Sequence, residues 1–316
     1  MTALDRQYRK TSLGLGFALL LMFLLLQGCM TALAFANRLL APYLAPDLLS
    51  GLYWGLYCLA YLFCFLMPIP FYRLILRKHV QQPVFYELRL PPMFLLLAVA
   101  ALGIITAAGY LNSLLVLPFG VQGNADPLIA LLEDGKPYML VAVFLMIVIV
   151  PPICEELLFR GLVLGNLLPY GRGVAIFGSA LLFAAMHQNL SQFLYAAVAG
   201  VLLGVLYEQS RSIWPCTLLH MLNNLWSYVQ LLIILRVPDE AKAGWTLLGL
   251  NVILILAGAI CALAVLFVRI LRGTPRPGTS TVARPRHPVK GFFVPSVIVF
   301  LAISLGMAVF NLTQGA

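Results

Sequence analysis

Apolar residues occupy this chain in long uninterrupted runs, and polar residues gather in the short stretches between them. A helix of about 20 apolar residues spans the hydrocarbon core of a bilayer. Inside lipid the backbone must satisfy its own hydrogen bonds within a helix or a closed barrel, and no strand-like alternation competes with the runs. We therefore predict nine membrane helices, at residues 12–36, 48–72, 93–118, 138–168, 172–188, 191–208, 213–235, 246–271 and 292–312.

The composition leads to the same fold class. Of the 316 residues, 62% are hydrophobic and 10% are charged, whereas soluble domains are about half apolar and a quarter charged. This surplus excludes a soluble enzyme, a disordered protein and a coiled coil. We predict an all-α, polytopic membrane helix bundle of eight to nine transmembrane helices. Its expected parts are N-terminal helices (1–137), a central core (138–235) and C-terminal helices with a basic, proline-rich loop (236–316).

The net charge of +9, from 20 Lys and Arg against 11 Asp and Glu, is explained by topology rather than by binding of nucleic acid. If Arg6, Arg9 and Lys10 are cytoplasmic, fifteen basic residues lie on that side and four on the other, with Arg160 set aside inside the membrane. Cytoplasmic loops carry such an excess of Lys and Arg. We expect a multi-pass protein of a bacterial or archaeal inner membrane with its N-terminus in the cytoplasm, and nine crossings would place the C-terminus outside.

Three features are given ordinary structural interpretations. The stretch 26–29 faintly resembles a lipoprotein cleavage box, but the apolar run continues past Cys29, so we expect the first helix to be retained. The loop at 273–290, rich in Pro and Arg, is interpreted as a linker against anionic lipid headgroups. The six cysteines lie inside apolar runs without CxxC spacing, which is typical of small buried hydrophobic residues.

Ionisable residues inside the predicted membrane helices are few. A charge at membrane depth costs about 3 kcal/mol or more, so such residues are candidates for function. They fall in three clusters, together with one carboxamide: Glu155, Glu156 and Arg160; His187; and His220 with Asn224.

Helical spacing predicts how the first cluster is arranged. Glu156 and Arg160 are four residues apart with the acid first, the favourable order for an ion pair on one helix face. Glu155 is rotated by about 100° from Glu156 and can face another partner. Pro151 and Pro152 predict a kink or a new helix start just before it.

The depths of the three clusters agree. Gly171, in the turn between two predicted helices, lies sixteen residues from both Glu155 and His187. At about 1.5 Å per residue, both side chains lie roughly 24 Å from that turn. His220 and Asn224 lie roughly 14–20 Å from the next turn on the same side. One shared site is therefore geometrically reasonable.

The chemistry of this set favours activation of water. It holds a carboxylate, two imidazoles and a carboxamide, without an obvious nucleophilic side chain. Glu155, His187 and His220 also form a common ligand set for catalytic zinc, so a metal stays open as an alternative. A single intramembrane His or Asn is usually a contact between helices, but four polar groups at compatible depths favour a catalytic site.

Other intramembrane protease types are disfavoured by the sequence. HExxH, the motif of site-2 zinc proteases, does not occur, and no Asp lies within a membrane run as presenilin-type enzymes require. The segment 178–181 reads Gly-Ser-Ala-Leu and lacks the GxSG motif of rhomboids.

The remaining motifs resemble one family. EExxxR (Glu155, Glu156, Arg160), FxxxH (Phe183, His187) and HxxxN (His220, Asn224), in this order on successive membrane helices, resemble the CAAX protease and bacteriocin-processing family. These glutamic-type intramembrane endopeptidases include the type II CAAX prenyl endopeptidases. The resemblance covers about residues 138–235, and residues 1–137 and 246–316 carry no motif that we can match.

The resemblance implies a role for each motif residue. Glu155 would activate water that His187 helps to hold, His220 and Asn224 would stabilise the tetrahedral oxyanion, and Glu156 with Arg160 would brace the site. Both metal-dependent and metal-free mechanisms are described for the family. We favour the metal-free one because a carboxamide suits an oxyanion hole better than it suits zinc. The implied substrate is a membrane-anchored or lipidated peptide, cut near its C-terminus or beside the membrane.

Two other functions are weighed. A non-catalytic member of the same fold, acting as an immunity factor or scaffold, would not need all four polar groups. A proton-coupled transporter could use them as a relay, but the sequence lacks a visible inverted repeat. The prediction is therefore an intramembrane endopeptidase.

Overall fold

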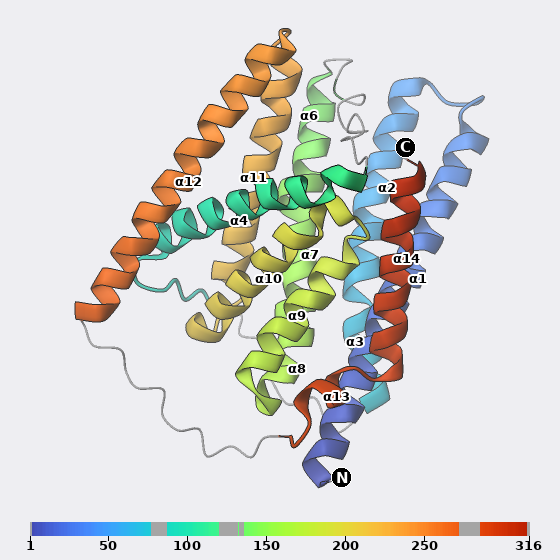
Figure 1. Cartoon of the computed structure of the whole chain (residues 1–316). Helices are drawn as coiled ribbons and strands as arrows, with labels where there is room; N and C mark the ends of the chain where they lie inside the picture. Colours follow the sequence, from blue (N-terminus) through green and yellow to red (C-terminus); the bar gives the residue numbers. More distant parts are fainter. Residues whose placement is uncertain (1, 77–86, 120–131, 133–135, 272–284, 315–316) are drawn as a thin grey trace.

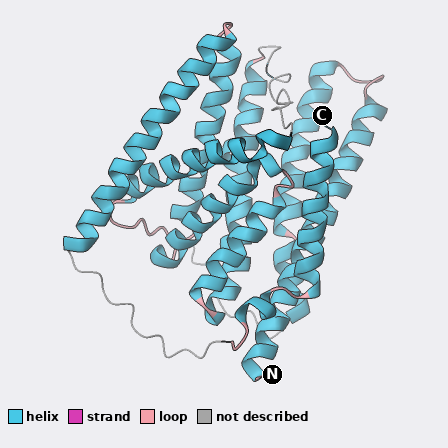
Figure 2. Cartoon of the chain, viewed as in Figure 1, coloured by secondary structure: helices cyan, strands magenta, loops and turns pink. Residues whose placement is uncertain are grey.

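The computed structural model describes residues 2–76, 87–119, 132, 136–271 and 285–314, and every regular element among them is a helix (Figure 2). The N-terminal helices are α1 (Ala3–Leu40), α2 (Pro46–Leu66), α3 (Pro68–Leu76) and α4 (Phe94–Val116), which a short 3₁₀ turn η1 (Leu117–Phe119) follows. The helices after residue 171 are α9 (Arg172–Met186), α10 (Leu190–Ser210), α11 (Trp214–Arg236), α12 (Glu240–Leu271), α13 (Pro288–Phe292) and α14 (Pro295–Gln314).

The predicted membrane helix bundle is confirmed. Each of the nine apolar runs is helical, and seven helical segments are long and apolar enough to cross a bilayer. The other two, Arg172–Met186 and Pro295–Asn311, are shorter apolar helices. Most of the basic loop predicted at 273–290 lies outside the described residues.

A single long helical segment, Pro137–Tyr170, forms the centre of the bundle. It changes geometry along its length, because the α-helical stretches alternate with two π-helical stretches. Pro151 and Pro152 do not break it: they occupy the first turn of an α-helical stretch that follows a π turn, where a missing N–H is tolerated. The pieces are α6 (Pro137–Phe144), η2 (π, Leu145–Ile149), α7 (Val150–Glu156), η3 (π, Leu157–Leu164), α8 (Gly165–Leu167) and η4 (3₁₀, Leu168–Tyr170).

The helices around this centre form two groups (Figure 1). On one side α1 packs along α2 and α14, and α9 lies between this group and α10. On the other side α4 and α10 pack together and cross the view obliquely, with α12 lying along α4. The two ends of the chain lie at opposite ends of the α1–α14 pair in this view.

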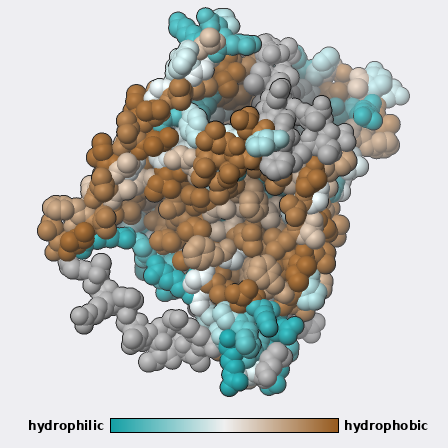
Figure 3. Space-filling view, viewed as in Figure 1, coloured by the Kyte–Doolittle hydropathy of each residue, from teal (hydrophilic) through white to brown (hydrophobic). Residues whose placement is uncertain are grey.

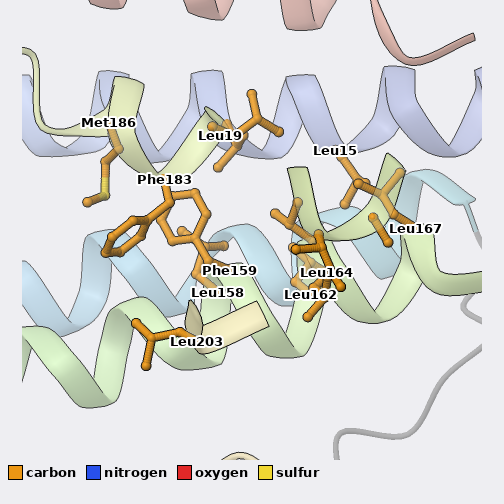
Figure 4. Close-up of a cluster of buried hydrophobic side chains, with 14 of the residues drawn as sticks. Leu15, Leu19, Leu158, Phe159, Leu162, Leu164, Leu167, Phe183, Met186 and Leu203 are labelled. Carbon is orange, nitrogen blue, oxygen red and sulfur yellow. The ribbon is translucent and has the colours of Figure 1, made fainter. Parts of the chain in front are cut away.

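The main hydrophobic core lies where α1, the central segment and α9 meet (Figure 4). Leu15 and Leu19 of α1 face Leu158 and Phe159 of the central segment, and all four are at most 1% exposed. The motif residues stand directly beside this close-packed cluster, which holds their helices in fixed positions.

The outer surface is apolar over its middle. Large hydrophobic side chains such as Leu95, Trp245 and Ile260 are more than two-thirds exposed. Figure 3 shows hydrophobic residues over the middle of one face and hydrophilic residues at its upper and lower ends. Exposed apolar area of this extent belongs in lipid. The chain is thus an integral, multi-pass membrane protein.

Glycines allow close approach between helices where α4 crosses α12. A Cβ atom at Gly103 would lie 2.8 Å from the Gly258 Cα and the Leu254 backbone oxygen. A backbone neighbour cannot rotate away as a side chain can. Small residues at such crossings are typical of helix packing in membranes.

We predict that Gly103→Leu destabilises the fold by about 1–3 kcal/mol, because an overpacked crossing must separate its two helices. Gly55→Leu on α2 is the matched control, since a Cβ there meets nothing within 4 Å. Thermal unfolding in detergent should show a lower midpoint for the first variant alone. Equal midpoints for the two variants would contradict the role of the crossing.

Candidate active site

The four predicted catalytic residues line one cavity of about 450 Å³. Glu155 comes from the central segment, His187 from the end of α9, and both His220 and Asn224 come from α11. The cavity also receives side chains from α2, α4 and α10, which lie on three further sides. These residues are Tyr57 and Tyr61 of α2, Ile105 of α4, and Gln192, Tyr195, Ala196, Ala199 and Leu203 of α10.

Glu156 stands behind the cavity and holds two partners with one oxygen. Its Oε1 lies 3.0 Å from Arg160 Nη1 and accepts a hydrogen bond of 2.8 Å from His220 Nδ1. Glu156 and Arg160 are both 0% exposed. The ion pair predicted from their spacing is confirmed, and its link to His220 is an additional feature that the sequence did not reveal.

Arg160 extends this buried network to two more helices. Its guanidinium carbon lies 4.6 Å from the centre of the Phe183 ring on α9, a cation–π contact. Its Nη2 donates to the Gly200 carbonyl of α10 at 3.4 Å. Gly200 can come this close to α9 because a Cβ on it would lie 2.8 Å from the Ala180 Cα.

Glu155 points into the cavity from the other side of its helix, as its rotation from Glu156 requires. Its Oε1 accepts a hydrogen bond of 2.7 Å from the Tyr61 hydroxyl on α2. Its Oε2 lies 3.8 Å from His220 Nε2 and has no hydrogen-bond partner among the described residues. One carboxylate oxygen is therefore fixed by a hydrogen bond, whereas the other is a buried acceptor without one among the described residues.

Tyr61 is a site residue that the sequence analysis missed. It belongs to a ladder of aromatic rings one helical turn apart on α2, stacked against Phe65 at 4.4 Å between ring centroids and against Tyr57 at 6.4 Å. The i, i+4 spacing of Tyr53, Tyr57 and Tyr61 was the available signal. Aromatic residues in a membrane run are so common that this spacing alone does not indicate a site.

His187 has its ring orientation fixed by its own helix. It is the C-terminal cap of α9, and its Nδ1 lies 2.9 Å from the Phe183 carbonyl oxygen. A carbonyl only accepts, so Nδ1 carries the hydrogen of this bond. In the neutral ring, the lone pair is then on Nε2. His187 can thus present a hydrogen-bond acceptor to the cavity.

Asn224 is held by a backbone defect that the prolines create. In a regular α-helix the N–H of residue 151 would bond to the Ile147 carbonyl, but Pro151 has no N–H. Asn224 Nδ2 donates to this Ile147 oxygen at 2.8 Å. Its Oδ1 accepts from Asn223 at 3.3 Å. The second N–H of the Asn224 amide remains for a group in the cavity.

A metal site is not evident in the arrangement of donors. Within the part of the chain that the structure describes, no group of three or more His, Cys, Asp or Glu side chains is arranged to hold a metal ion. His187 Nδ1 and Glu155 Oε1 are both occupied by hydrogen bonds inside the protein. Glu155 Oε2 and the Nε2 atoms of His187 and His220 are not the atoms held by these bonds, so the zinc alternative for Glu155, His187 and His220 stays a prediction.

Comparison with known families identifies the central part of the chain. Residues 137–226 match the family described as type II CAAX prenyl endopeptidase Rce1-like. No curated protein and no solved structure gives a significant match to the chain. The matched segment carries all three motifs, so this part of the chain is similar to the members of that family.

We predict that removal of either partner of the Glu156–Arg160 pair destabilises the fold by about 3–5 kcal/mol, because the other charge stays buried without compensation. Glu156→Leu and Arg160→Met should each lower the thermal midpoint strongly. The double variant should lose less than the sum, since it leaves no uncompensated charge.

The pair Arg172–Glu208, at 3.1 Å and with both side chains partly exposed, is the matched control. Its removal should cost less than about 1 kcal/mol. Strictly additive losses for Glu156 and Arg160 would contradict the coupling of the buried pair.

Proposed function

We propose that this chain is an intramembrane endopeptidase in which Glu155 activates a water molecule to hydrolyse a peptide bond. The match of residues 137–226 to the CAAX protease family provides the class of reaction. The observation that carries the mechanism is the buried Glu155 carboxylate at the cavity wall, with Oε1 held by Tyr61 and Oε2 without a hydrogen-bond partner among the described residues.

In the proposed reaction, Glu155 Oε2 takes one proton from water, while the other hydrogen stays on the water oxygen and donates a hydrogen bond to the lone pair of His187 Nε2. The resulting hydroxide forms a bond to the carbonyl carbon of the scissile peptide, and the carbonyl oxygen becomes the oxyanion. Collapse of the tetrahedral intermediate breaks the C–N bond, and Glu155 returns its proton to the leaving nitrogen. General acid–base catalysis of this kind contributes about 10²–10⁴-fold to the rate.

The oxyanion would receive hydrogen bonds from His220 and Asn224. His220 donates its Nδ1 hydrogen to Glu156, and a ring that carries the second hydrogen as well presents it on Nε2, beside the Glu155 carboxylate. Its Nε2–H is then a donor beside the reacting carbon. The free N–H of Asn224 provides the second donor, and such preorganised donors stabilise developing charge strongly in a site that excludes water.

The proposed substrate is a membrane-anchored or lipidated peptide, in keeping with the description of the matched family as a CAAX prenyl endopeptidase. Such tails carry a lipidated Cys followed by two aliphatic residues and a last variable one. The distribution of Lys and Arg favours a cytoplasmic N-terminus. We place the protein in the inner membrane of a bacterium or archaeon.

We expect Glu155→Gln to reduce turnover at least about 100-fold, because the amide cannot act as a base but still accepts the Tyr61 hydrogen bond. The assay is release of fluorescence from a quenched peptide that ends in a farnesylated CAAX sequence, with purified protein in detergent. Glu208→Gln, outside the cavity, is the control for a carboxylate-to-amide change.

Full turnover by folded Glu155→Gln protein would reject glutamate-activated water. If the wild-type protein cleaved none of a panel of lipidated peptides, this result would favour a non-catalytic immunity or scaffold function. Proton-coupled flux in liposomes would favour a transporter instead.

We further predict that 1,10-phenanthroline and EDTA leave turnover unchanged within about twofold, because the proposed steps use only side chains of this chain. The measurement is the same peptide assay after prolonged dialysis against chelator. Loss of activity that zinc restores would instead support a metal held by Glu155, His187 and His220.

A further inference from the structure

A second cavity of about 570 Å³ adjoins the catalytic one. Ile105, Tyr195, Asn223 and Ser227 line both, so the two are neighbouring parts of one internal surface. The second cavity lies between α4, α11 and α12, with the first turns of α10 at its side. The mechanism proposed above makes no use of it.

Three helices each present one regular stripe to this cavity. Its lining on each of them follows the spacing i, i+3, i+4, i+7, which is one face of an α-helix. The residues are Thr106, Gly109, Tyr110 and Ser113 on α4, Asn223, Trp226, Ser227 and Gln230 on α11, and Gly244, Leu247, Leu248 and Asn251 on α12. On α4 and α11 most of these lining residues are polar, whereas on α12 only Asn251 is.

Asn251 organises the polar groups of the cavity and is 6% exposed. Its Oδ1 accepts from Trp226 Nε1 at 3.0 Å, and its Nδ2 donates to Tyr110 Oη at 3.2 Å and to Gln230 Oε1 at 3.1 Å. The amide hydrogens of Gln230 and the hydroxyl hydrogen of Tyr110 are then left for a ligand, within the described part of the chain. A polar surface at membrane depth needs such a partner.

The lining identifies the chemical class of that partner. Hydroxyl, carboxamide, phenol and indole groups line this cavity, and none of the described residues around it is Asp, Glu, Lys, Arg or His. A phosphate or a carboxylate would lack a counter-charge here. A neutral ligand with alternating donors and acceptors fits, and the peptide backbone is such a ligand.

A peptidase in a membrane has a particular need for such a surface. An endopeptidase must hold its substrate unwound at the scissile bond, and an unwound backbone in lipid leaves N–H and C=O groups unsatisfied. Each unsatisfied group costs several kcal/mol in hydrocarbon. A polar cavity continuous with the catalytic one would remove this cost over the residues next to the cut.

We propose that the cavity between α4, α11 and α12 binds the extended backbone of the substrate peptide beside the scissile bond. This inference rests on the proposed function. Most of its lining lies outside residues 137–226, the segment that matches the protease family. The site therefore belongs to the particular substrate of this chain rather than to the shared chemistry.

Two glycines provide a direct test, since both Gly109 and Gly244 line the cavity and a Cβ on either meets nothing within 4 Å. Gly244→Leu should therefore fill the cavity without disturbing the fold. Gly249→Leu on the same helix is the matched control, because its Cβ is also unobstructed and Gly249 does not line the cavity. With the farnesylated CAAX peptide, we expect Gly244→Leu to raise KM at least about tenfold with little change in kcat, and Gly249→Leu to leave both unchanged.

The position of the peptide is tested separately from its cleavage. A photo-reactive benzoylphenylalanine is placed in turn at each position of the same farnesylated peptide, and cross-links to the wild-type protein and to Glu155→Gln are mapped by mass spectrometry. We expect cross-links in 106–113 and 244–251, and their loss in Gly244→Leu.

Cross-links in these segments without any turnover would retain this inference and reject the proposed function. Turnover without a cross-link in either segment would support the proposed function and reject this inference. The absence of such cross-links from every probe overturns the inference, whether or not the peptide is cleaved. It is also overturned if photo-reactive phosphatidylcholine labels these segments and excess peptide does not reduce the labelling.

Discussion

The buried Glu156 carboxylate is the interaction on which the rest of the site depends. It pairs with Arg160 at 3.0 Å and accepts a hydrogen bond from His220 at 2.8 Å, in a place where neither charged residue has any exposure. A buried charge without a partner would cost several kcal/mol. The ion pair lies within the central segment, whereas the His220 contact joins this segment to α11 and would break if the two helices slid past each other. One oxygen atom thus fixes α11 against the central segment. His220 Nε2 lies beside Glu155 as a consequence of that fixed position.

The irregular backbone of the central segment also helps to position the site residues. Glu155 and Glu156 are adjacent, and helical rotation sends one into the cavity and the other behind it. The prolines that follow the first π turn deprive the Ile147 carbonyl of its usual donor, and Asn224 supplies the replacement. A π turn next to a site is a common functional feature. Here the Ile147 carbonyl, which lacks its usual backbone donor, accepts a hydrogen bond from Asn224 and so sets the position of that α11 side chain.

The sequence was enough to find the ionisable residues inside the membrane helices. It was not enough to find the contacts between residues on different helices. The nine helical runs follow from the length of the apolar stretches. The Glu156–Arg160 pair follows from the spacing of two residues on one helix, where distance along the chain fixes distance in space. The contact of Tyr61 with Glu155 joins residues 94 positions apart, and no local rule relates them. The bond between Asn224 and Ile147 likewise needs the register of two helices. The spacing of the lining residues on α4, α11 and α12 can be found in the sequence, but the sequence does not show that these three faces meet.

The catalytic cavity and the second cavity are lined largely by different parts of the chain. The groups proposed to react all lie in residues 137–226, the segment that is similar to the CAAX protease family. The wall that fixes Glu155 and most of the second cavity come from α2, α4 and α12, outside that segment. Reactive groups must keep their mutual geometry within a fraction of an ångström, whereas a surface that binds backbone needs only suitable donors and acceptors. Substitutions in α2, α4 and α12 can therefore change which substrate binds. The buried pair of Glu156 and Arg160 cannot change as freely, because loss of either partner leaves an uncompensated buried charge.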